Sequence, residues 1–196
     1  MLKKLDHPNI VEYFETYDDK HYLYLVMELC PGGELFDNHE QYLKNNKPYS
    51  EKQAAEVIFK CLEALSHCHA MGITHRDIKP ENIMFGKDGE VRLVDFGLAK
   101  DSIFKMRTYA GTPYFMAPEV LNGSYTHKCD IWSLACVLYL LVAGKLPYSG
   151  LSREEVFKKI RKGKFQQLDT FSPELKSLLS QMFQLDPENR PTAHEL

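Results

Sequence analysis

The sequence lacks an excess of basic charge. Its 196 residues include 24 Lys and Arg against 27 Asp and Glu, which gives a net charge of -3. Proteins that hold nucleic acid through its phosphate backbone usually carry a basic surface, so we expect no nucleic-acid partner. A phosphate-bearing ligand would have to be held locally, by a few charged residues.

The cysteines lack the spacing of a disulfide framework or a structural zinc site. The five of them are odd in number and scattered, and no C-x-x-C pair occurs, so we expect a reducing compartment, the cytoplasm or the nucleus. His67, Cys68 and His69 are adjacent, but neighbouring residues lie on different faces of a helix. We therefore expect the last turn of a helix there, with a half-buried cysteine, rather than a metal site.

Long apolar runs are missing as well. The most apolar stretch, IWSLACVLYLLVAG from Ile131 to Gly144, is shorter than the roughly 20 residues that a membrane span needs. The N-terminus has no apolar region of the kind that a signal peptide shows. Since 44% of the residues are hydrophobic, we expect a large core in which this stretch is a buried helix.

Two segments have the pattern of β-hairpins. From Ile10 to Leu29, IVEYFETY and YLYLVMEL flank the polar DDKH, and the second strand stops at Pro31-Gly32-Gly33. Further along, NIMFG and EVRLVDF flank the turn Lys87-Asp88-Gly89. Helical patterns dominate the rest of the chain.

Capping residues mark four helix starts. SEKQ and SREE are capping boxes, each followed at helix distance by a terminating glycine, and TAHE has a similar pattern. A further start has serine followed by proline, which is favoured at a first helical position. The helices expected from these patterns run from Ser50 to Gly72, from Ser152 to Gly163, from Ser172 onward and from Thr192 onward.

Reactive side chains concentrate in two stretches on either side of the second predicted hairpin. HRDIKPEN, from His75 to Asn82, precedes it, and DFG, from Asp95 to Gly97, follows it. The hairpin would bring two carboxylates to one site. One carboxylate with an amide oxygen could hold a divalent metal, while the other orients a hydroxyl group.

These two stretches, followed by the A-P-E sequence of Ala117-Pro118-Glu119, resemble the ordered signature of the eukaryotic-type protein kinases. The resemblance covers essentially the whole chain. It implies an α+β, bilobal fold, in which residues 1–30 are a remnant of the small β-lobe and residues 31–196 are the mainly helical large lobe with an incomplete last helix. It also implies ATP and Mg²⁺ as cofactors and proteins as substrates.

Carried over position by position, the resemblance implies four catalytic roles. Asp77 would accept or orient the proton of the substrate hydroxyl, Asn82 and Asp95 would hold Mg²⁺, and Lys79 would contact the γ-phosphate. Lys79 also indicates the serine/threonine branch, as does Thr112 in GTPYFMAPE. A small-molecule kinase is a less favoured interpretation, because GTPYFMAPE resembles a platform for protein substrates.

The same resemblance implies an adenine site. Met27 in LVMEL would be the gatekeeper, and the Glu28 carbonyl and Cys30 amide would bind the base. Glu34 would reach the ribose, and Met84 would form the floor of the adenine pocket. In the alternative interpretation, the two methionines fill the core, and both interpretations can hold.

Other residues would act around the site. Thr108, between DFG and APE, matches the usual phosphorylation site of the activation segment, and Arg76 would pair with its phosphate; the alternative is an ordinary exposed threonine. The resemblance also implies that Glu119 pairs with Arg190 and that Asp130 holds the backbone of the catalytic loop. Such partners are what a buried carboxylate needs.

Within the family, the chain looks most like the calcium/calmodulin-dependent group, and within it like the plant and protist calcium-dependent kinases. Glu34 and Glu81 would then favour a basic residue upstream of the target serine or threonine. No D-x-[DN]-x-[DN]-G loop occurs. Control by calcium or calmodulin is therefore expected only through regions outside this sequence.

The N-terminus departs from the family pattern. Met1, Leu2 and Leu5 lie where one face of a helix would place them, and Asp6-His7-Pro8-Asn9 predicts its end. The glycine-rich loop, the strand lysine and the helix glutamate that bind ATP in the family are not in this sequence. We expect an N-terminally truncated form of an active kinase; the alternative is a non-catalytic, kinase-like binding protein.

Overall fold

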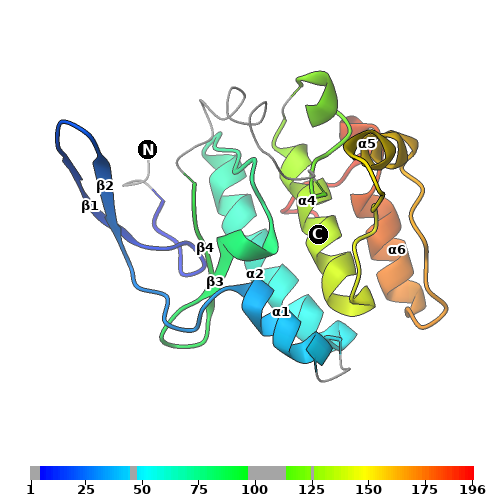
Figure 1. Cartoon of the computed structure of the whole chain (residues 1–196), viewed down its shortest axis with the longest axis horizontal. Coiled ribbons are helices and arrows are strands. Elements are labelled where there is room, and N and C mark those ends of the chain that lie inside the picture. Colours follow the sequence, from blue (N-terminus) through cyan, green and yellow to red (C-terminus); the bar gives the residue numbers. More distant parts are fainter. Residues whose placement is uncertain (1–4, 45–47, 97–113, 125) are drawn as a thin grey trace.

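The computed structural model describes residues 5–44, 48–96, 114–124 and 126–196 (Figure 1). The described elements are helices and two small antiparallel sheets, so the fold is of the α+β class. The strands are β1 (Tyr13–Asp18), β2 (Leu23–Met27), β3 (Ile83–Phe85) and β4 (Val91–Leu93). The helices are α1 (Leu35–Lys44), α2 (Glu51–Ala70), α4 (Lys128–Ala143), α5 (Arg153–Lys162) and α6 (Pro173–Met182), with single 3₁₀ turns at Pro80–Asn82, Val120–Asn122 and Pro187–Asn189.

Helix α2 begins where its sequence predicts. Ser50 Oγ accepts a hydrogen bond from Gln53 N at 3.3 Å, and Gln53 Oε1 accepts one from Ser50 N at 3.1 Å, which completes the capping box. The helix ends before Gly72, which has a φ of 72°. Glycine adopts this left-handed conformation without the steric cost that other residues have.

Of the other two helix starts with a serine cap, one differs in part from the prediction. Ser152 Oγ caps α5 by accepting from Glu155 N at 3.2 Å, but Glu155 Oε2 accepts from Leu151 N, at 3.0 Å, instead of from Ser152 N. The capping box predicted there is therefore half formed, because the carboxylate reaches one residue further back. Ser172 caps α6 through Leu175 N at 3.1 Å, as predicted.

The C-terminal prediction was also partly wrong. Thr192 and Glu195 make both reciprocal hydrogen bonds of a capping box, from Thr192 N to Glu195 Oε2 at 2.7 Å and from Glu195 N to Thr192 Oγ1 at 3.3 Å. Among the described residues, however, residues 193–195 form a turn and not a helix. The reciprocal hydrogen bonds of Thr192 and Glu195 close this turn.

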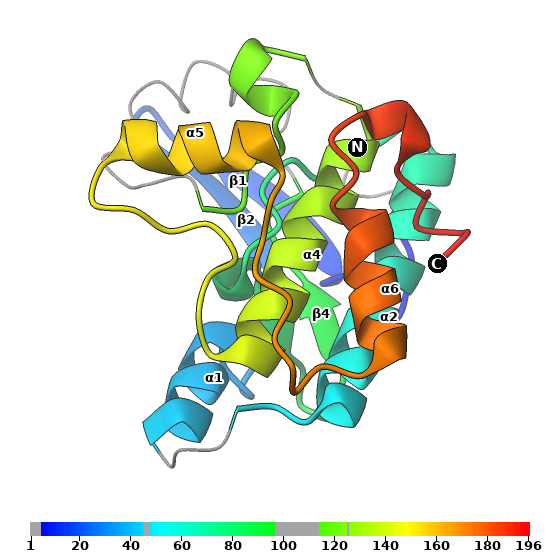
Figure 2. The same ribbon diagram turned by 90° about the vertical axis from the view of Figure 1, so that its right-hand side faces the viewer.

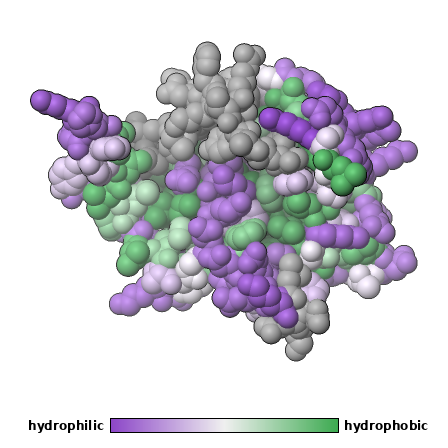
Figure 3. Space-filling view, viewed as in Figure 1, coloured by the Kyte–Doolittle hydropathy of each residue, from purple (hydrophilic) through white to green (hydrophobic). Residues whose placement is uncertain are grey.

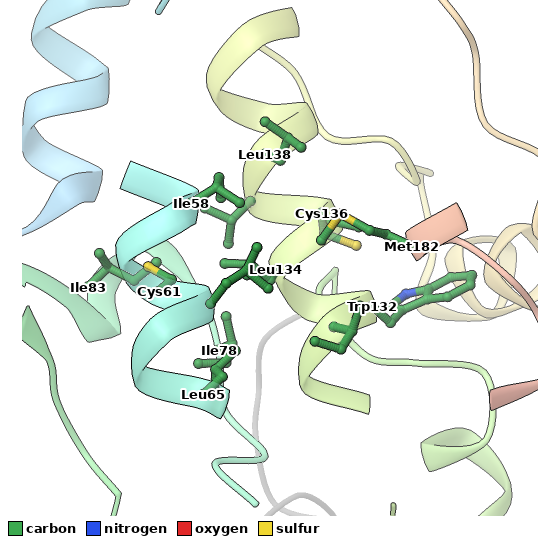
Figure 4. Close-up of a cluster of buried hydrophobic side chains, with 14 of the residues drawn as sticks. Ile58, Cys61, Leu65, Ile78, Ile83, Trp132, Leu134, Cys136, Leu138 and Met182 are labelled. Atoms are coloured by element: carbon green, nitrogen blue, oxygen red, sulfur yellow. The ribbon is translucent and has the colours of Figure 1, made fainter. Parts of the chain in front are cut away.

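Helix α4 is the centre of the core. It runs beside α2 and α6 (Figures 1 and 2), and apolar side chains are buried all round it, which confirms the predicted buried helix. Trp132 stacks on Tyr148 with ring centroids 5.6 Å apart and meets Phe183 edge-on at 5.0 Å. Figure 4 shows Leu134 on the side of α4 that faces Ile58 of α2. No helix in the described part of the chain is both long enough and apolar enough for a membrane span.

Both predicted hairpins are present. β1 pairs with β2, with an irregular register between Tyr13 and Glu15, and β3 pairs with β4. The β3–β4 hairpin is extended on both edges, because Ile10 bridges to Leu93 in parallel and Glu34 bridges to Met84 in antiparallel orientation. Two segments near the N-terminus thus flank the hairpin that lies between HRDIKPEN and DFG.

The β1–β2 hairpin extends from the body of the molecule and exposes apolar side chains (Figures 1 and 3). Leu23 and Tyr22 are each 67% exposed. Because successive residues of a strand point to opposite faces, apolar residues are exposed on both faces of this sheet. The exposed set is Phe14, Tyr17, Tyr22, Leu23, Tyr24 and Leu25.

Three sequence expectations need adjustment. Of the predicted N-terminal helix end, Met1 and Leu2 lie outside the described residues, and residues 5–7 are not helical. Helix α1 was not predicted. All five cysteines are free and buried, and Cys68 is fully buried rather than half-buried, because its side chain joins the core under α4.

Candidate active site

The loop that begins with His75 is held by a carboxylate from α4. Asp130 Oδ2 accepts hydrogen bonds from His75 N at 2.9 Å and from His69 Nε2 at 2.8 Å, and Asp130 Oδ1 accepts one from Arg76 N at 2.8 Å. Asp130 is fully buried. These are the partners that a buried carboxylate requires, and they fix the backbone of the loop as expected from the sequence.

The His75 ring joins this loop to the chain after β4. Its Nδ1 accepts a hydrogen bond from Asp77 N at 3.3 Å, so its Nε2 donates to Val94 O at 2.9 Å. Phe96 packs edge-on against the ring, with centroids 4.6 Å apart. Burial lowers the pKa of His75, which keeps the imidazole neutral and maintains one donor and one acceptor. The sequence did not predict this linking role.

Asp77, Lys79 and Asn82 lie together. Asn82 Nδ2 donates to Asp77 O at 2.7 Å and to Asp77 Oδ2 at 3.0 Å, and Lys79 Nζ donates to Asp77 Oδ2 at 2.8 Å. The Asp77 side chain is 48% exposed. Its carboxylate is thus oriented by two neighbours and still accessible to a substrate group.

A backbone hydrogen bond of the preceding residue brings Asp95 close to Asn82. Val94 N donates to Asn82 O at 3.1 Å, so the residue after Val94 lies beside the end of the HRDIKPEN loop. Asp95 is exposed, and its backbone is left-handed with a φ of 64°. The charges of both Asp77 and Asp95 act on the His75 ring and raise its pKa against the larger effect of burial.

The donor set fits a hard divalent cation. Because the Asn82 amide nitrogen bonds to Asp77, its Oδ1 is left as an acceptor, and Asp95 adds a carboxylate. Among the residues that the structure describes, no group of three or more His, Cys, Asp or Glu could hold a metal alone. Mg²⁺ is a hard cation that typically binds through one or two protein carboxylates together with substrate phosphates.

A small apolar cluster lies beside these polar groups. Val11, Cys30 and Val94 are buried, and Met27 and Met84 pack against them. The structure therefore brings together three residues that the sequence placed around adenine. The sequence did not predict that Val11 and Val94 join this cluster, although Val94 directly precedes Asp95.

The three glutamates predicted at this site have different surroundings. The Glu28 carboxylate accepts from Arg92 Nε, at 3.2 Å for Oε1 and 3.0 Å for Oε2. Glu34 lies at the start of α1, where its backbone pairs with Met84, and Glu81 is exposed in the 3₁₀ turn before β3. Thr108 and Thr112 lie outside the described residues.

The expected ion pair between Glu119 and Arg190 is present and buried. Arg190 Nη1 donates to Glu119 Oε1 at 2.7 Å, and Nη2 donates to Oε2 at 3.1 Å. The guanidinium also donates to the carbonyls of Gln184 and Lys128 and lies over the Trp132 ring at 5.2 Å. Every part of this buried cation is therefore paired or packed.

Comparison with known families agrees with this geometry. A family model described as "Protein kinase domain" matches residues 1–196. The chain belongs to the protein kinase family. The motifs HRDIKPEN, DFG and APE all lie within the matched residues.

Curated relatives of this kinase chain include calcium-dependent kinases. It is 41% identical over 170 residues to calcium-dependent protein kinase 5 of Plasmodium falciparum (isolate 3D7), covering 84% of this chain and 29% of the relative. It is 37% identical over 205 residues to calcium-dependent protein kinase 3 of Plasmodium yoelii yoelii, covering 100% and 37%. Sperm motility kinase 3A of Mus musculus is 38% identical over 200 residues, covering 100% and 39%. The chain thus spans well under half the length of these relatives.

Proposed function

We propose that this kinase chain is part of a serine/threonine protein kinase that transfers the γ-phosphoryl group of ATP to protein hydroxyls. The observation that carries the proposal is the arrangement of Asp77, Lys79 and Asn82 within hydrogen-bonding distance of one another, with Asp95 beside them. A binding module has no chemical need for all four groups.

In the proposed reaction, the substrate hydroxyl oxygen bonds to the γ-phosphorus, and the bond from that phosphorus to the β–γ bridging oxygen breaks, which releases ADP. Asp77 orients the hydroxyl and takes up its proton, and Lys79 contacts the γ-phosphate. Asn82 and Asp95 would hold Mg²⁺, which neutralises charge on the phosphates when bound. Positioning and electrostatic stabilisation supply most of the catalysis in such reactions.

The apolar cluster supports the adenine site. Met27 and Met84 line it from two different hairpins, next to Cys30. Among the described residues, neither the Glu28 carbonyl nor the Cys30 amide takes part in the backbone hydrogen bonds of this region. We propose that these two groups bind the adenine edge and that Glu34 contacts the ribose.

Specificity and activation follow from the same assignment. Lys79 favours serine and threonine acceptors, and Glu34 and Glu81 favour a basic residue upstream of the acceptor. We further propose that Thr108 is phosphorylated and that its phosphate binds Arg76. The adjacent catalytic loop would thereby respond to the state of the activation segment.

We also propose the two-lobe organisation, with residues 1–30 in the small lobe and residues 31–196 in the large lobe. The activity of the whole protein would then include small-lobe groups that bind the ATP phosphates. Control by calcium or calmodulin would act through other regions of the whole protein.

A phosphotransfer assay tests the proposal. The whole protein, with the small-lobe groups that bind the ATP phosphates, is incubated with Mg-ATP and matched peptides that carry serine, threonine or tyrosine after an upstream arginine. We expect serine and threonine to be labelled, and Asp95→Ala and Asp77→Asn each to lower the rate at least about a hundredfold. Asp169→Asn, an exposed acid away from the site, is the control. Activity that survives Asp95→Ala would contradict the metal assignment, and absence of transfer with intact Mg-ATP binding would favour the binding-protein alternative.

A further inference from the structure

Arg92 occupies the middle of β4 and makes charged contacts in two directions. Its side chain is only 12% exposed. Nε donates to both oxygens of Glu28, and Nη2 donates to Asp88 Oδ2 at 2.9 Å. Asp88 belongs to the turn of the same hairpin, whereas Glu28 comes from the segment after β2. One contact is therefore local, and the other joins two distant parts of the chain.

The segment that contains Glu28, residues 28–34, is held at its far end by backbone contacts with β3. Gly32 N donates to Phe85 O at 3.0 Å, and Phe85 N donates to Gly33 O at 3.0 Å. A Cβ at Gly32 would lie 2.6 Å from Phe85 Cβ, so this close approach requires glycine. At the near end, the backbone contact is from Glu28 N to Glu12 O at 2.8 Å, and Arg92 supplies the ionic contact to the hairpin.

The Arg92–Glu28 pair, which we call the latch, lies next to the apolar cluster. Arg92 is directly opposite Met84 in the β3–β4 register, so the two side chains share a face of the hairpin. Val94, two residues further along, is on that face too. The pKa of the Cys30 thiol is raised, mainly by burial. The nearby charges of Glu28 and Asp88 also raise it, and that of Arg92 lowers it.

The latch differs from an ordinary surface ion pair. Exposed pairs usually contribute little, because solvent screens them and two flexible side chains must be ordered. Here the guanidinium is mostly buried and one nitrogen contacts both carboxylate oxygens, while Glu28 Oε2 also accepts from Glu12 N at 3.4 Å. Arginine suits this site because its planar donors can serve Glu28 and Asp88 at once.

We propose that Arg92 is a positioning residue for nucleotide binding. Through its contacts with the Glu28 carboxylate, it fixes the near end of residues 28–34 and thereby sets the positions of the Glu28 carbonyl and the Cys30 amide beside the apolar cluster. The nucleotide part of this inference rests on the proposed function, because it takes those two backbone groups as the adenine partners.

The test uses four variants of the protein. Arg92→Met keeps the bulk of the side chain and removes the charge, and Glu28→Gln removes the carboxylate. Arg92→Lys keeps the charge but loses the planar fork. Asp88→Asn is the matched control, because it breaks the local contact of the same arginine and leaves Glu28 in place.

Two measurements are made on each variant: the amide hydrogen exchange of residues 28–34 without nucleotide, and the dissociation constant for Mg-ATP. For Arg92→Met and Glu28→Gln we expect faster exchange in this segment and about tenfold weaker ATP binding. We expect Arg92→Lys to recover part of the affinity and Asp88→Asn to stay within about twofold of the wild type. The double variant Arg92→Met/Glu28→Gln should be no weaker than either single variant.

If amide exchange in residues 28–34 were unchanged in Arg92→Met, the latch would not hold this segment, whatever the affinity for Mg-ATP. Faster exchange with unchanged ATP affinity would overturn its positioning role, and so would an effect of Asp88→Asn equal to that of Arg92→Met. A wild-type protein that fails to bind Mg-ATP would contradict the proposed function and with it the nucleotide role of Arg92. The exchange data would then still decide whether the latch holds the segment.

Discussion

His39 in α1 is buried, with 3% of its surface exposed, and neither ring nitrogen has a hydrogen-bond partner among the described residues. Its ring packs near Tyr49, with centroids 6.1 Å apart. Burial is the one cause that lowers the pKa of His39 from its ordinary value of 6.5. The folded protein therefore holds this residue neutral, while the unfolded chain binds a proton more readily.

The sign of the resulting pH dependence follows from that difference. The unfolded state takes up more protons, so the contribution of His39 to stability is complete above pH 6.5 and is lost as the pH falls below it. Each unit of the pKa shift corresponds to about 1.4 kcal/mol. We expect His39→Leu to unfold in urea with a smaller loss of stability between pH 8 and pH 5.5 than the wild type. His194→Leu, at an exposed site, is the control, and an equal pH dependence in all three proteins would contradict this assignment.

The Arg190–Glu119 pair gives a second prediction at the level of residues. Arg190→Met would leave the Glu119 carboxylate buried without its cation, which typically costs about 3–5 kcal/mol. We expect a large decrease in the free energy of unfolding, measured by urea titration. Lys44→Met is the matched control, because it removes a lysine whose pair with Glu40 is exposed, and its unfolding midpoint should stay near that of the wild type. If Arg190→Met and Lys44→Met lowered the free energy of unfolding equally, the buried pair would contribute no more than the exposed one.

The sequence predicted individual reactive residues better than the contacts that orient them. Asp77, Asn82 and Asp95 stand in recognisable motifs, so their proximity could be expected. The direction of the Asn82 amide and the link through His75 depend on where Val94 and Asp130 come to lie in three dimensions. No local pattern encodes these distances, and the same holds for the contact between Arg92 and Glu28.

At the scale of elements, α2 and α6 are joined at their N-termini by one side chain. Glu51 Oε2 accepts from Ser172 Oγ at 2.6 Å, and Glu51 Oε1 accepts from Ser172 N at 2.9 Å. Ser172 Oγ also accepts from Leu175 N to cap α6. A carboxylate near two helix N-termini is electrostatically favourable, because both ends carry partial positive charge.

This arrangement predicts different costs for two similar substitutions. Ser152→Ala removes a helix cap, for which the usual cost is about 1 kcal/mol. Ser172→Ala removes the same kind of cap and also a hydrogen bond to Glu51, so we expect it to lower the free energy of unfolding further. Denaturant unfolding of both variants provides the comparison. If Ser172→Ala costs no more than Ser152→Ala, the contact with Glu51 contributes nothing measurable.

Local sequence accounts for most elements but not for all. The two hairpins and the starts of α2, α5 and α6 follow from strand patterns and capping residues that act over a few positions. Helix α1 has no serine or threonine at its start, which is why the capping pattern did not reveal it, and its inward face includes the buried His39. The turn at residues 193–195 is the opposite case. There the hydrogen bonds of a capping box form, but the described residues are a turn and not a helix.

At the scale of the whole molecule, the β1–β2 hairpin is mostly exposed: every residue from Phe14 to Leu25 is exposed. A short two-stranded sheet has unpaired backbone groups on both edges, and apolar side chains on such a sheet favour association between molecules. We expect the 196-residue chain to self-associate with increasing concentration, as measured by sedimentation velocity. Leu23→Lys/Leu25→Lys should reduce this association. Leu151→Lys, which replaces a fully exposed leucine outside the hairpin, is the control and should leave the association unchanged. If it reduced the association as much as the double substitution, the hairpin would not be the contact surface.

Arg76 and Asp95 have a backbone conformation that is unfavourable for most residues other than glycine. Both have positive φ angles, 69° and 64°, in a region where glycine is favoured and a side chain adds strain of the order of 1–3 kcal/mol. Glycine at either position would relieve that strain and remove a charged group beside the candidate site. Both side chains are therefore held in place at some cost in stability, which is typical of residues near a functional site.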